Sequence, residues 1–564
     1  MPSAWRVRTS DPAHTAALSR DAQVPPVVAQ LLLARGVAGG EEARRFLRPE
    51  RDALHDPLLL AGAEAAADLL VSAARAGRRI VVFGDYDVDG VTAVAQLRAA
   101  LLRAGADAVA FLPHRLRDGY GLRPETVNKV LDQMSPSVIV TVDCGITAVE
   151  GVALARSRGV DVIVTDHHLV PDELPGGAIV VNPRQPGCRY PDKELAACGI
   201  SMKIALAVAR RAGVALAEES LLRVACLGTI ADLVPLIGEN RVIAAAGLAA
   251  LARPRAPGLR ALLEECGIEA GRAPTAEDVA FRLAPRLNAA GRLDTAALAL
   301  ALFEERDPGS ARAIARELSV RNGERQSLER RVVAEARQRI EAGFDPDRDR
   351  VIVEGSAGWH RGVLGIAASR LAREYHRPVL LFALEGERAS GSGRSVAGVP
   401  LHATLKAIET FFREFGGHDQ AVGGSLDAAR WEDFRQAARA HFAASVPLER
   451  LEPVEEAEAA LPLEEVNDEL VAHLERLEPH GMGNPRPVLQ ASVVAAGPFR
   501  PLGESGGRGH LRRAAGFLDC VCWRRDLLDE FAPGRPLEAH YRLARDRGGR
   551  IEAELVAARG LVPA

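Results

Sequence analysis

The sequence predicts an α/β protein with a parallel sheet in its first half and smaller domains after it. Short runs of apolar, mostly β-branched residues alternate there with longer stretches rich in Ala, Leu and Arg. This alternation is typical of parallel strands that helices cover on both faces. The length of 564 residues also allows roughly three to five domains of ~100–200 residues each.

The elements are expected in the following order. Residues 25–49 predict short amphipathic helices. Helical stretches continue to about residue 300 around a set of strand-like runs, and the spacing of these runs leaves room for the crossover helices that parallel strands need. The runs are Ile80–Phe83, Ala108–Leu112, Val138–Val142, Val160–Thr165 and Ala178–Val181.

A long helix and a second domain are expected next. Residues 307–342 contain no proline after Pro308 and are rich in Ala, Arg, Glu and Leu, which predicts a charged helix that links domains. Strand-like runs resume at Val351–Val353 and Val379–Phe382, with glycine-rich turns between helical stretches. They predict a smaller α/β domain that ends near residue 430.

The last part of the chain changes in charge. Residues 445–480 are strongly acidic, whereas residues 481–564 carry an excess of basic side chains. This change predicts an acidic connector before a mildly basic terminal module. Alternating strand-like pieces broken by Gly and Pro predict a small β-barrel in that module. The pieces are Leu489–Val494, Ala515–Val521 and Leu537–Leu543.

Composition excludes several classes of protein. Hydrophobic residues make up 48% and charged residues 26% of the chain, so it is not a disordered chain, a collagen or a disulfide scaffold. It has no run of ~20 apolar residues, as a membrane span needs, and its N-terminus lacks the apolar core of a secretory signal. The seven cysteines form no CxxC pair. We therefore expect a cytoplasmic protein with free thiols and no membrane association.

Acidic and imidazole side chains follow three of the predicted strands. Because the C-terminal ends of parallel strands form one ligand crevice, we expect these side chains to converge. Another acid, Asp232, lies in an apolar segment further along the chain. The strand-end residues are Asp85, Asp87 and Asp89 after Ile80–Phe83, Asp143 after Val138–Val142, and Asp166, His167 and His168 after Val160–Thr165.

Several carboxylates in one crevice repel one another, and a divalent cation is the natural compensation. Carboxylate and imidazole ligands suit Mn²⁺ or Mg²⁺. Two such ions ~3.5–4 Å apart would clamp a phosphoryl group, so we expect metal-assisted hydrolysis of a phosphoanhydride or phosphodiester. Taken singly, each acid also fits a simple turn. An EF-hand is excluded because Gln96 stands where its bidentate Glu is required.

These motifs resemble a known family. DYDVDG, VDCG, TDHH and GTIADLVPL are similar to the motifs of DHH phosphoesterases, and GRSVAG and GGHDQAVGGS to those of the associated DHHA1 domain. FLRP, LAPRLNAAGRLDTA and the basic tail resemble one branch, the RecJ single-strand-specific 5′→3′ exonucleases. The resemblance covers nearly the whole chain from about residue 25.

The resemblance implies a division of the chain into units. They are an N-terminal helical segment (1–49), a DHH catalytic domain (50–300), a connecting helix (301–345), a DHHA1 substrate-binding domain (346–432), an acidic connector (433–485) and an OB-fold-like nucleic-acid-binding domain (486–564).

The resemblance also implies roles for the clustered residues. Asp87 and Asp143 would hold one Mn²⁺ or Mg²⁺ ion, and Asp89, Asp143, His167 and Asp232 the other, with Asp143 between them. His168 would face the substrate phosphate, and Asp85 would be a supporting acid. The expected catalytic residues are therefore His168, Asp143 and Asp85.

Phosphate-binding chemistry is expected in both α/β domains. The glycines, hydroxyls and guanidinium of Gly391–Ser395 suit an anion, and Arg115 is a candidate for gripping the terminal phosphate. Turns and ordinary surface positions remain the alternative interpretation. The resemblance implies that Ser392, Arg394, Gly417 and His418 contact the nucleic-acid strand of the substrate. Further candidates for this contact are Arg282, Arg286, Asn288, Arg292, Gln326 and His360. In the tail they are Arg508, His510, Arg512, Arg513, Arg524 and Arg525.

The resemblance predicts an exonuclease that degrades single-stranded DNA 5′→3′ to mononucleotides in repair and recombination. Partners would be single-stranded DNA, a single-strand binding protein and a repair helicase, and we expect a monomer. Aromatic residues make up only 4% of the chain, so phosphate contacts should dominate binding. The alternatives are a DHH-family phosphodiesterase acting on short oligonucleotides or cyclic dinucleotides, and an inactive scaffold protein.

Overall fold

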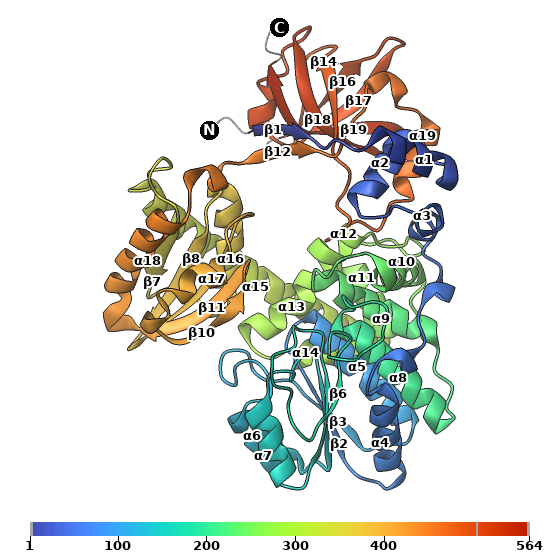
Figure 1. The fold of residues 1–564 in the computed structure, drawn as a ribbon, viewed down its shortest axis with the longest axis vertical. Helices are drawn as coiled ribbons and strands as arrows, with labels where there is room; N and C mark the ends of the chain where they lie inside the picture. Colours follow the sequence, from blue (N-terminus) through green and yellow to red (C-terminus); the bar gives the residue numbers. More distant parts are fainter. Residues whose placement is uncertain (1–3, 504–505, 547, 561–564) are drawn as a thin grey trace.

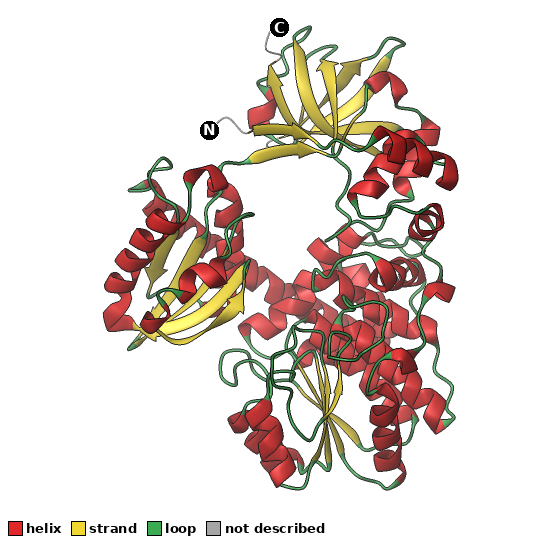
Figure 2. Ribbon diagram, viewed as in Figure 1, coloured by secondary structure: helices red, strands yellow, loops and turns green. Residues whose placement is uncertain are grey.

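The computed structural model describes residues 4–503, 506–546 and 548–560. Three bodies follow one another around an open centre, and the chain returns at its end to the elements with which it began (Figure 1). The first body is a parallel sheet with its helices, the second a mixed sheet with fewer helices, and the third a sheet rich in antiparallel strands (Figure 2).

The first sheet has the order β3-β2-β4-β5-β6, and every pairing in it is parallel. This confirms the predicted parallel α/β architecture. Successive side chains of β2 alternate between two apolar cores, with Ile80 and Val82 on one face and Val81 and Phe83 on the other. The strands are β2 (Ile80–Gly84), β3 (Ala108–Phe111), β4 (Val138–Val142), β5 (Asp161–Thr165) and β6 (Ile179–Val181).

Helices cover both faces of this sheet, which is why its strands are apolar along their whole length. One face is covered by α4 (Ala63–Arg75), α5 (Val88–Arg103) and α8 (Ala197–Ala212), and the other by α6 (Pro124–Met134) and α7 (Val149–Ser157).

Further helices extend the first body. A π-helix, Val279–Leu283, joins α12 to α13. The helices are α9 (Glu218–Ala231), α10 (Gly238–Leu251), α11 (Pro257–Glu265), α12 (Ala276–Asp278), α13 (Ala284–Leu293) and α14 (Ala297–Glu304).

The predicted connecting helix is α15 (Pro308–Glu341), 34 residues long. Asp307 caps it by accepting a hydrogen bond from the Ser310 amide at 2.7 Å. Its N-terminal part packs on α11, α13 and α14, and its C-terminal part packs on α16 and β7 of the second body. One helix therefore belongs to both cores and sets the spacing between them.

The second sheet has the order β10-β11-β9-β8-β7, and only β7 and β8 are parallel. The sequence predicted these two strands but not the other three, because glycines and polar residues interrupt their apolar pattern. The strands are β7 (Ile352–Ser356), β8 (Val379–Glu385), β9 (Arg388–Arg394), β10 (Phe412–His418) and β11 (Ala421–Asp427). The helices are α16 (Arg361–Tyr375), α17 (Leu401–Lys406) and α18 (Trp431–Ser445).

The third sheet has seven strands in the order β13-β14-β18-β19-β17-β16-β15. The sequence predicted β14, β17 and β18 and missed the rest. The strands are β13 (Ala459–Ala460), β14 (Leu489–Val494), β15 (Arg500–Leu502), β16 (Gly506–Arg512), β17 (Phe517–Cys522), β18 (Pro536–Arg545) and β19 (Ile551–Gly560), with the short helices α19 (Asp468–Glu475) and α20 (Arg525–Leu528).

The N-terminal elements share an apolar core with this third sheet, which is distant from them in sequence (Figure 1). Strand β1 (Ala4–Val7) pairs in parallel with β12 (Val454–Ala457). Leu31 of α2, Leu470 of α19 and Tyr541 of β18 share one apolar core. The stretch expected as an acidic connector (433–485) is therefore divided between two bodies, because α18 and Leu451 belong to the core of the second body and Leu461–Leu477 to the core of the third. The helices are α1 (Pro12–Ala22), α2 (Pro26–Ala34) and α3 (Gly40–Leu47).

The described part of the chain contains no single helix that is both long and apolar enough to cross a membrane. Two helical segments joined at a bend, Arg51–Leu59 and Ala63–Arg75, together reach the length and apolar composition of a membrane span, by length and composition alone.

Candidate active site

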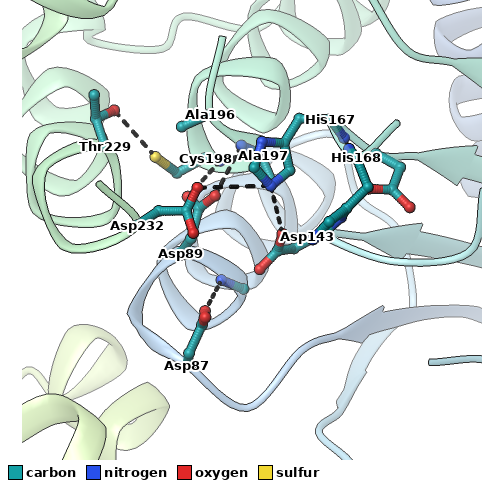
Figure 3. Close-up of polar contacts among 12 residues, drawn as sticks. Asp87, Asp89, Asp143, His167, His168, Ala196, Ala197, Cys198, Thr229 and Asp232 are labelled. Carbon is teal, nitrogen blue, oxygen red and sulfur yellow. Dashed lines mark hydrogen bonds and ion pairs between the residues drawn. The ribbon is translucent and has the colours of Figure 1, made fainter. Parts of the chain in front are cut away.

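The predicted metal ligands meet at the C-terminal edge of the parallel sheet. Asp87 caps α5 and accepts a hydrogen bond from the Gly90 amide at 3.1 Å, which directs the start of that helix and its neighbour Asp89 toward the other strands. Asp143 follows β4 in a left-handed conformation, with φ of 64°. His167 follows β5, and Asp232 ends α9. Four separate segments thus contribute to one site (Figure 3).

His167 lies at the centre of this group. Its Nε2 atom is 3.2 Å from Asp143 Oδ1 and 3.6 Å from Asp232 Oδ2. Asp143 and His167 each belong to two of the three sets whose possible ligand atoms all lie within 4.8 Å of one another. The sets are Asp85, Asp87 and Asp143; Asp89, His167 and Asp232; and Asp143, His167 and His168.

The carboxylates are held close together although they are buried. Burial and the charge of Asp87 raise the pKa of Asp89 to about 6, and burial and the charge of Asp89 raise the pKa of Asp232 to about 9. Burial and neighbouring carboxylates also raise the pKa of Asp143 and of Asp85 well above the usual range. Such mutual repulsion is what a divalent cation relieves.

The donor set fits such a cation. His167 Nε2 and Asp85 Oδ1 are buried and have no hydrogen-bond partner among the described residues, which is unusual for buried polar atoms. Burial and the neighbouring His168 lower the pKa of His167 to about 3, so its ring is neutral and able to act as a ligand. Oxygen and imidazole donors without a thiolate suit Mn²⁺ or Mg²⁺.

His168 belongs to the third of these sets, with Asp143 and His167, and is oriented by Asp166. The two side chains form a 2.7 Å contact between His168 Nδ1 and Asp166 Oδ1. Asp166 also accepts hydrogen bonds from the amides of Ile146 at 2.9 Å and His167 at 2.8 Å. Burial lowers the pKa of His168, but the hydrogen bond to Asp166 and the charges of Asp166, Asp85 and Asp87 together raise the pKa above its ordinary value. The outer nitrogen of a protonated His168 is a good donor to phosphate.

Two residues beside His168 were given no role by the sequence analysis, although it expected Asp166 to lie at this edge of the sheet. Asp166, the first member of the Asp-His-His triplet, is 1% exposed and acts by orienting its neighbour. Tyr120 donates a hydrogen bond to the Asp143 carbonyl at 3.1 Å, and its hydroxyl lies 3.4 Å from His168 Nδ1. A signal for Tyr120 exists in the sequence, because it stands between two glycines in the segment that carries Arg115.

Three arginines from different elements lie near one another, and two of them, Arg115 and Arg292, lie near the carboxylates Asp85 and Asp87. Burial, followed by the charges of Arg115 and Arg325, lowers the pKa of Arg292 to about 9 despite the favourable charge of Asp87. Burial and the charge of Arg115 lower the pKa of Arg394. Among the described residues, Arg115, Arg292 and Arg394 form no ion pair. Crowded guanidinium groups without a carboxylate partner suit an anion, as the sequence analysis expected for Arg115 and Arg394.

The neighbours of these arginines hold them in place. Arg394 Nη1 donates to the Gly393 carbonyl at 2.8 Å and to Ser392 Oγ at 3.1 Å. The Arg115 guanidinium lies 4.9 Å from the centre of the Tyr86 ring. A side chain at Gly365 of α16 would come within 2.8 Å of Arg394 Nη2, so the absence of a side chain there leaves room for the guanidinium.

Other predicted substrate residues are placed differently. Asn288 accepts a hydrogen bond from the Val88 amide at 3.1 Å and so supports the start of α5. Arg286 is tied to the fold, since it donates to Ser319 Oγ at 2.9 Å and to the Arg282 carbonyl at 2.6 Å. His360 caps α16 by accepting from the Gly362 amide at 3.1 Å. Burial lowers the pKa of His360.

The remaining candidates, two at the end of β10 and one on α15, are exposed. Gly417 and His418 form the exposed end of β10, where Gly417 has φ of 137° and a side chain would meet the Ala421 carbonyl. Gln326 is an exposed residue of α15.

The basic residues predicted for the terminal module are mostly neutralised. Arg508 pairs with Glu552 at 3.0 Å, His510 with Asp519 at 2.9 Å and Arg524 with Asp526 at 2.6 Å. Arg513 donates to the Val466 carbonyl at 2.6 Å. Arg512 and Arg525 remain exposed. These contacts offset part of the positive charge of the six residues, and a basic groove along them stays a prediction.

The fold and the site define the class of the protein, and comparison with known families agrees with it. Three family models match in chain order: the DHH family N-terminal domain over residues 79–229, the DHHA1 domain over residues 348–444 and the RecJ OB domain over residues 457–553. The predicted DHH and DHHA1 motifs and the OB-fold-like C-terminal part are confirmed.

The most similar proteins narrow the class to one family. "Single-stranded-DNA-specific exonuclease RecJ" of Bacillus subtilis is 35% identical over 538 residues, covering 94% of this chain and 67% of that protein. The protein of the same description from Escherichia coli is 37% identical over 437 residues, 74% of each. The crystal structure of RecJ in complex with Mn²⁺ from Thermus thermophilus matches with a TM-score of 0.84 and 31% identity, over 99% of this chain and 80% of that one. The chain belongs to the RecJ family.

Proposed function

We propose that this protein is a single-stranded-DNA-specific exonuclease that hydrolyses phosphodiester bonds with two divalent cations, Mn²⁺ or Mg²⁺. It acts 5′→3′ and releases 5′-mononucleotides. The proposal places it as a monomer in the cytoplasm, in DNA repair and recombination, with a single-strand binding protein and a repair helicase as partners. Its relatives from Bacillus subtilis and Escherichia coli are described as single-stranded-DNA-specific exonucleases.

One observation carries the proposal: an anion site and a set of candidate metal ligands lie side by side. Arg115, Arg292 and Arg394 crowd together without acidic partners, and the charge of Asp87 acts on Arg292. A phosphate bound by the arginines would place the next phosphate of the same strand near the carboxylates. Cleavage there removes one nucleotide from a 5′ end, which accounts for both the polarity and the product.

The residues divide the chemistry among them. Asp87, Asp89, Asp143, His167 and Asp232 would hold the two ions, with Asp85 as a supporting acid beside Asp87 and Asp143. The bound ions supply charge neutralisation at phosphorus and lower the pKa of water. His168, oriented by Asp166, donates a hydrogen bond to a phosphate oxygen. The arginines and Ser392 grip the terminal phosphate and align the strand.

The division into a catalytic unit (50–300) and a substrate-binding unit (346–432) stays a proposal, although helix α18 (Trp431–Ser445) of the second body continues past residue 432. Strand contacts by Arg286, Asn288, His360, Gly417 and His418 also stay proposals. Arg286, Asn288 and His360 would act by supporting helices and not by direct contact, because they are bonded within the protein.

A digest of end-labelled DNA tests the function. A 5′-phosphorylated single strand should yield mononucleotides with Mn²⁺ or Mg²⁺ and stay intact with chelator, and a blunt duplex of the same sequence should resist. The Asp143→Asn variant is the inactive control. Equal digestion of strand and duplex, or turnover of cyclic dinucleotides without action on long strands, would contradict the proposal.

A further inference from the structure

Three consecutive polar side chains at the start of α10 are almost completely buried. Glu239, Asn240 and Arg241 are 2%, 0% and 2% exposed. None of them belongs to the site described above, and each is bonded to a different part of the chain. Buried polar groups of this kind are retained where they hold particular segments together.

Glu239 and Arg241 anchor the beginning of the helix from two sides. Glu239 forms an ion pair with Lys203 and accepts hydrogen bonds from Tyr190 and from the His55 amide. Arg241 donates to the carbonyls of Phe46 at 2.8 Å, Glu478 at 2.7 Å, Arg476 at 3.1 Å and Pro479 at 3.3 Å. The residue between them is therefore held at a fixed position.

Asn240 joins two segments that lie on either side of it. Its Oδ1 atom accepts a hydrogen bond from the Ala196 amide at 3.3 Å. Its Nδ2 atom donates to the carbonyls of Pro235, at 3.2 Å, and Glu194. All the polar atoms of this side chain are thus used by the segments 194–196 and 235.

Each of the two segments leads directly to a candidate metal ligand. Ala196 caps α8, and the next two amides, those of Ala197 and Cys198, donate to Asp89 Oδ2 at 2.9 Å and Oδ1 at 2.8 Å (Figure 3). Pro235 lies three residues after Asp232, across a residue in the left-handed conformation, Leu233 with φ of 62°. Asp89 and Asp232 belong to the same ligand set, together with His167.

We propose that Asn240 is a positioning residue that sets the separation of Asp89 and Asp232. The proposal rests on the proposed function, because it assumes that these carboxylates hold a cation. Without the Asn240 amide, the Pro235 carbonyl and the Ala196 amide would be left buried and unpaired, so both segments would shift to find partners. Residues that orient metal ligands typically change metal affinity or activity by about 10–100-fold when they are replaced.

The test is a Mn²⁺ titration of the full-length chain, by calorimetry and by the electron paramagnetic resonance signal of free Mn²⁺. Asn240→Asp keeps the shape and the acceptor but removes the donor, and Asn240→Ser leaves room for a water in a polar site. We expect each variant to bind Mn²⁺ about 10–100-fold more weakly than wild type. The KM for single-stranded DNA should be unchanged, and millimolar Mn²⁺ should restore kcat.

Asn484→Ser is the matched control. Asn484 is also 0% exposed and donates to two carbonyls, those of Leu477 at 2.7 Å and Pro479 at 2.9 Å. Neither carbonyl belongs to the segments that Asn240 joins, and Arg241, which also donates to Pro479, keeps its bonds to three other carbonyls. We expect a loss of thermal stability in this variant without a change in Mn²⁺ affinity.

The outcomes separate the two proposals. Wild-type protein that takes up no Mn²⁺ overturns the proposed function. If the wild type binds Mn²⁺ and either folded Asn240 variant binds it with the same affinity, the positioning role alone is overturned. A loss of affinity of the same size in Asn484→Ser would also overturn it, because the effect would then follow from general destabilisation.

Discussion

Arg394 connects the second body to the anion site, and its replacement by alanine tests that site. The Arg394 Nη1 atom donates hydrogen bonds to the Gly393 carbonyl at 2.8 Å and to Ser392 Oγ at 3.1 Å. The other nitrogens of this side chain make no bond within the described structure. They are available to a phosphate that reaches the cluster.

The magnitude follows from the charge of both groups. A hydrogen bond to a charged partner contributes about 1.5–3 kcal/mol, and 1.4 kcal/mol is a factor of ten. Arg394→Ala should therefore raise the KM for a 5′-phosphorylated strand by about 10- to 150-fold. A 5′-hydroxyl strand lacks the recognised group and should be affected by only about threefold. The preference of the enzyme for the 5′-phosphate should thus largely disappear.

The assay is steady-state digestion of the two labelled strands, side by side. Arg388→Ala is the matched control, because Arg388 lies on the same strand β9 but pairs with Glu414 at 2.7 Å on an exposed surface. Since burial and Arg115 lower the pKa of Arg394, its charge disfavours the fold, and the variant should unfold at the same or a higher temperature. An unchanged preference for the 5′-phosphate in folded Arg394→Ala would refute the phosphate site.

Three further predictions concern charge. In metal-free protein the pKa values of Asp89, about 6, and Asp232, about 9, are higher than the value of about 3.9 in the unfolded chain. The contribution of these two groups to stability is therefore full at low pH and is lost as pH rises through the folded pKa values. Thermal unfolding in chelator should show stability falling from pH 5 toward pH 9 on this account, and Mn²⁺ should reverse the fall; a flat profile would contradict it. Asp143→Asn should lower nuclease activity by at least about a hundredfold and raise the unfolding temperature in chelator, because it removes a repelling buried carboxylate; residual activity near wild type would exclude a ligand role. If three arginines carry strand binding, log affinity should fall by about 2 for each tenfold rise in salt, measured by fluorescence anisotropy, and a slope near zero would show that stacking dominates.

Local patterns in the sequence determined the parallel sheet and the identity of the carboxylates. The apolar runs at 80–83 and 138–142 predict buried strands, and an acid that follows such a strand must lie at the C-terminal edge of the sheet. The convergence of Asp87, Asp143 and His167 follows from this rule of topology, without knowledge of any distance. The motif resemblance then indicated the family, which the comparisons confirmed.

Only the tertiary structure decided which other residues serve the site. Arg286 and Arg292 are both arginines of one helix, yet the first is bonded to Ser319 and the second joins the cluster with Arg115 and Arg394. The face that a helical residue presents depends on the packing of α13 against α15 and α16, and no short window of sequence contains that information.

The same reason explains the largest differences between the fold expected from the sequence and the observed fold. The N-terminal helices share a core with the C-terminal sheet, and Asn240 joins segments that lie 5 and 44 residues away from it. Side-chain periodicity shows that a surface must be buried but not which distant surface covers it. The sequence alone therefore determined the chemistry of the metal ligands, whereas the assembled chain decided the anion site and the contacts that hold those ligands in place.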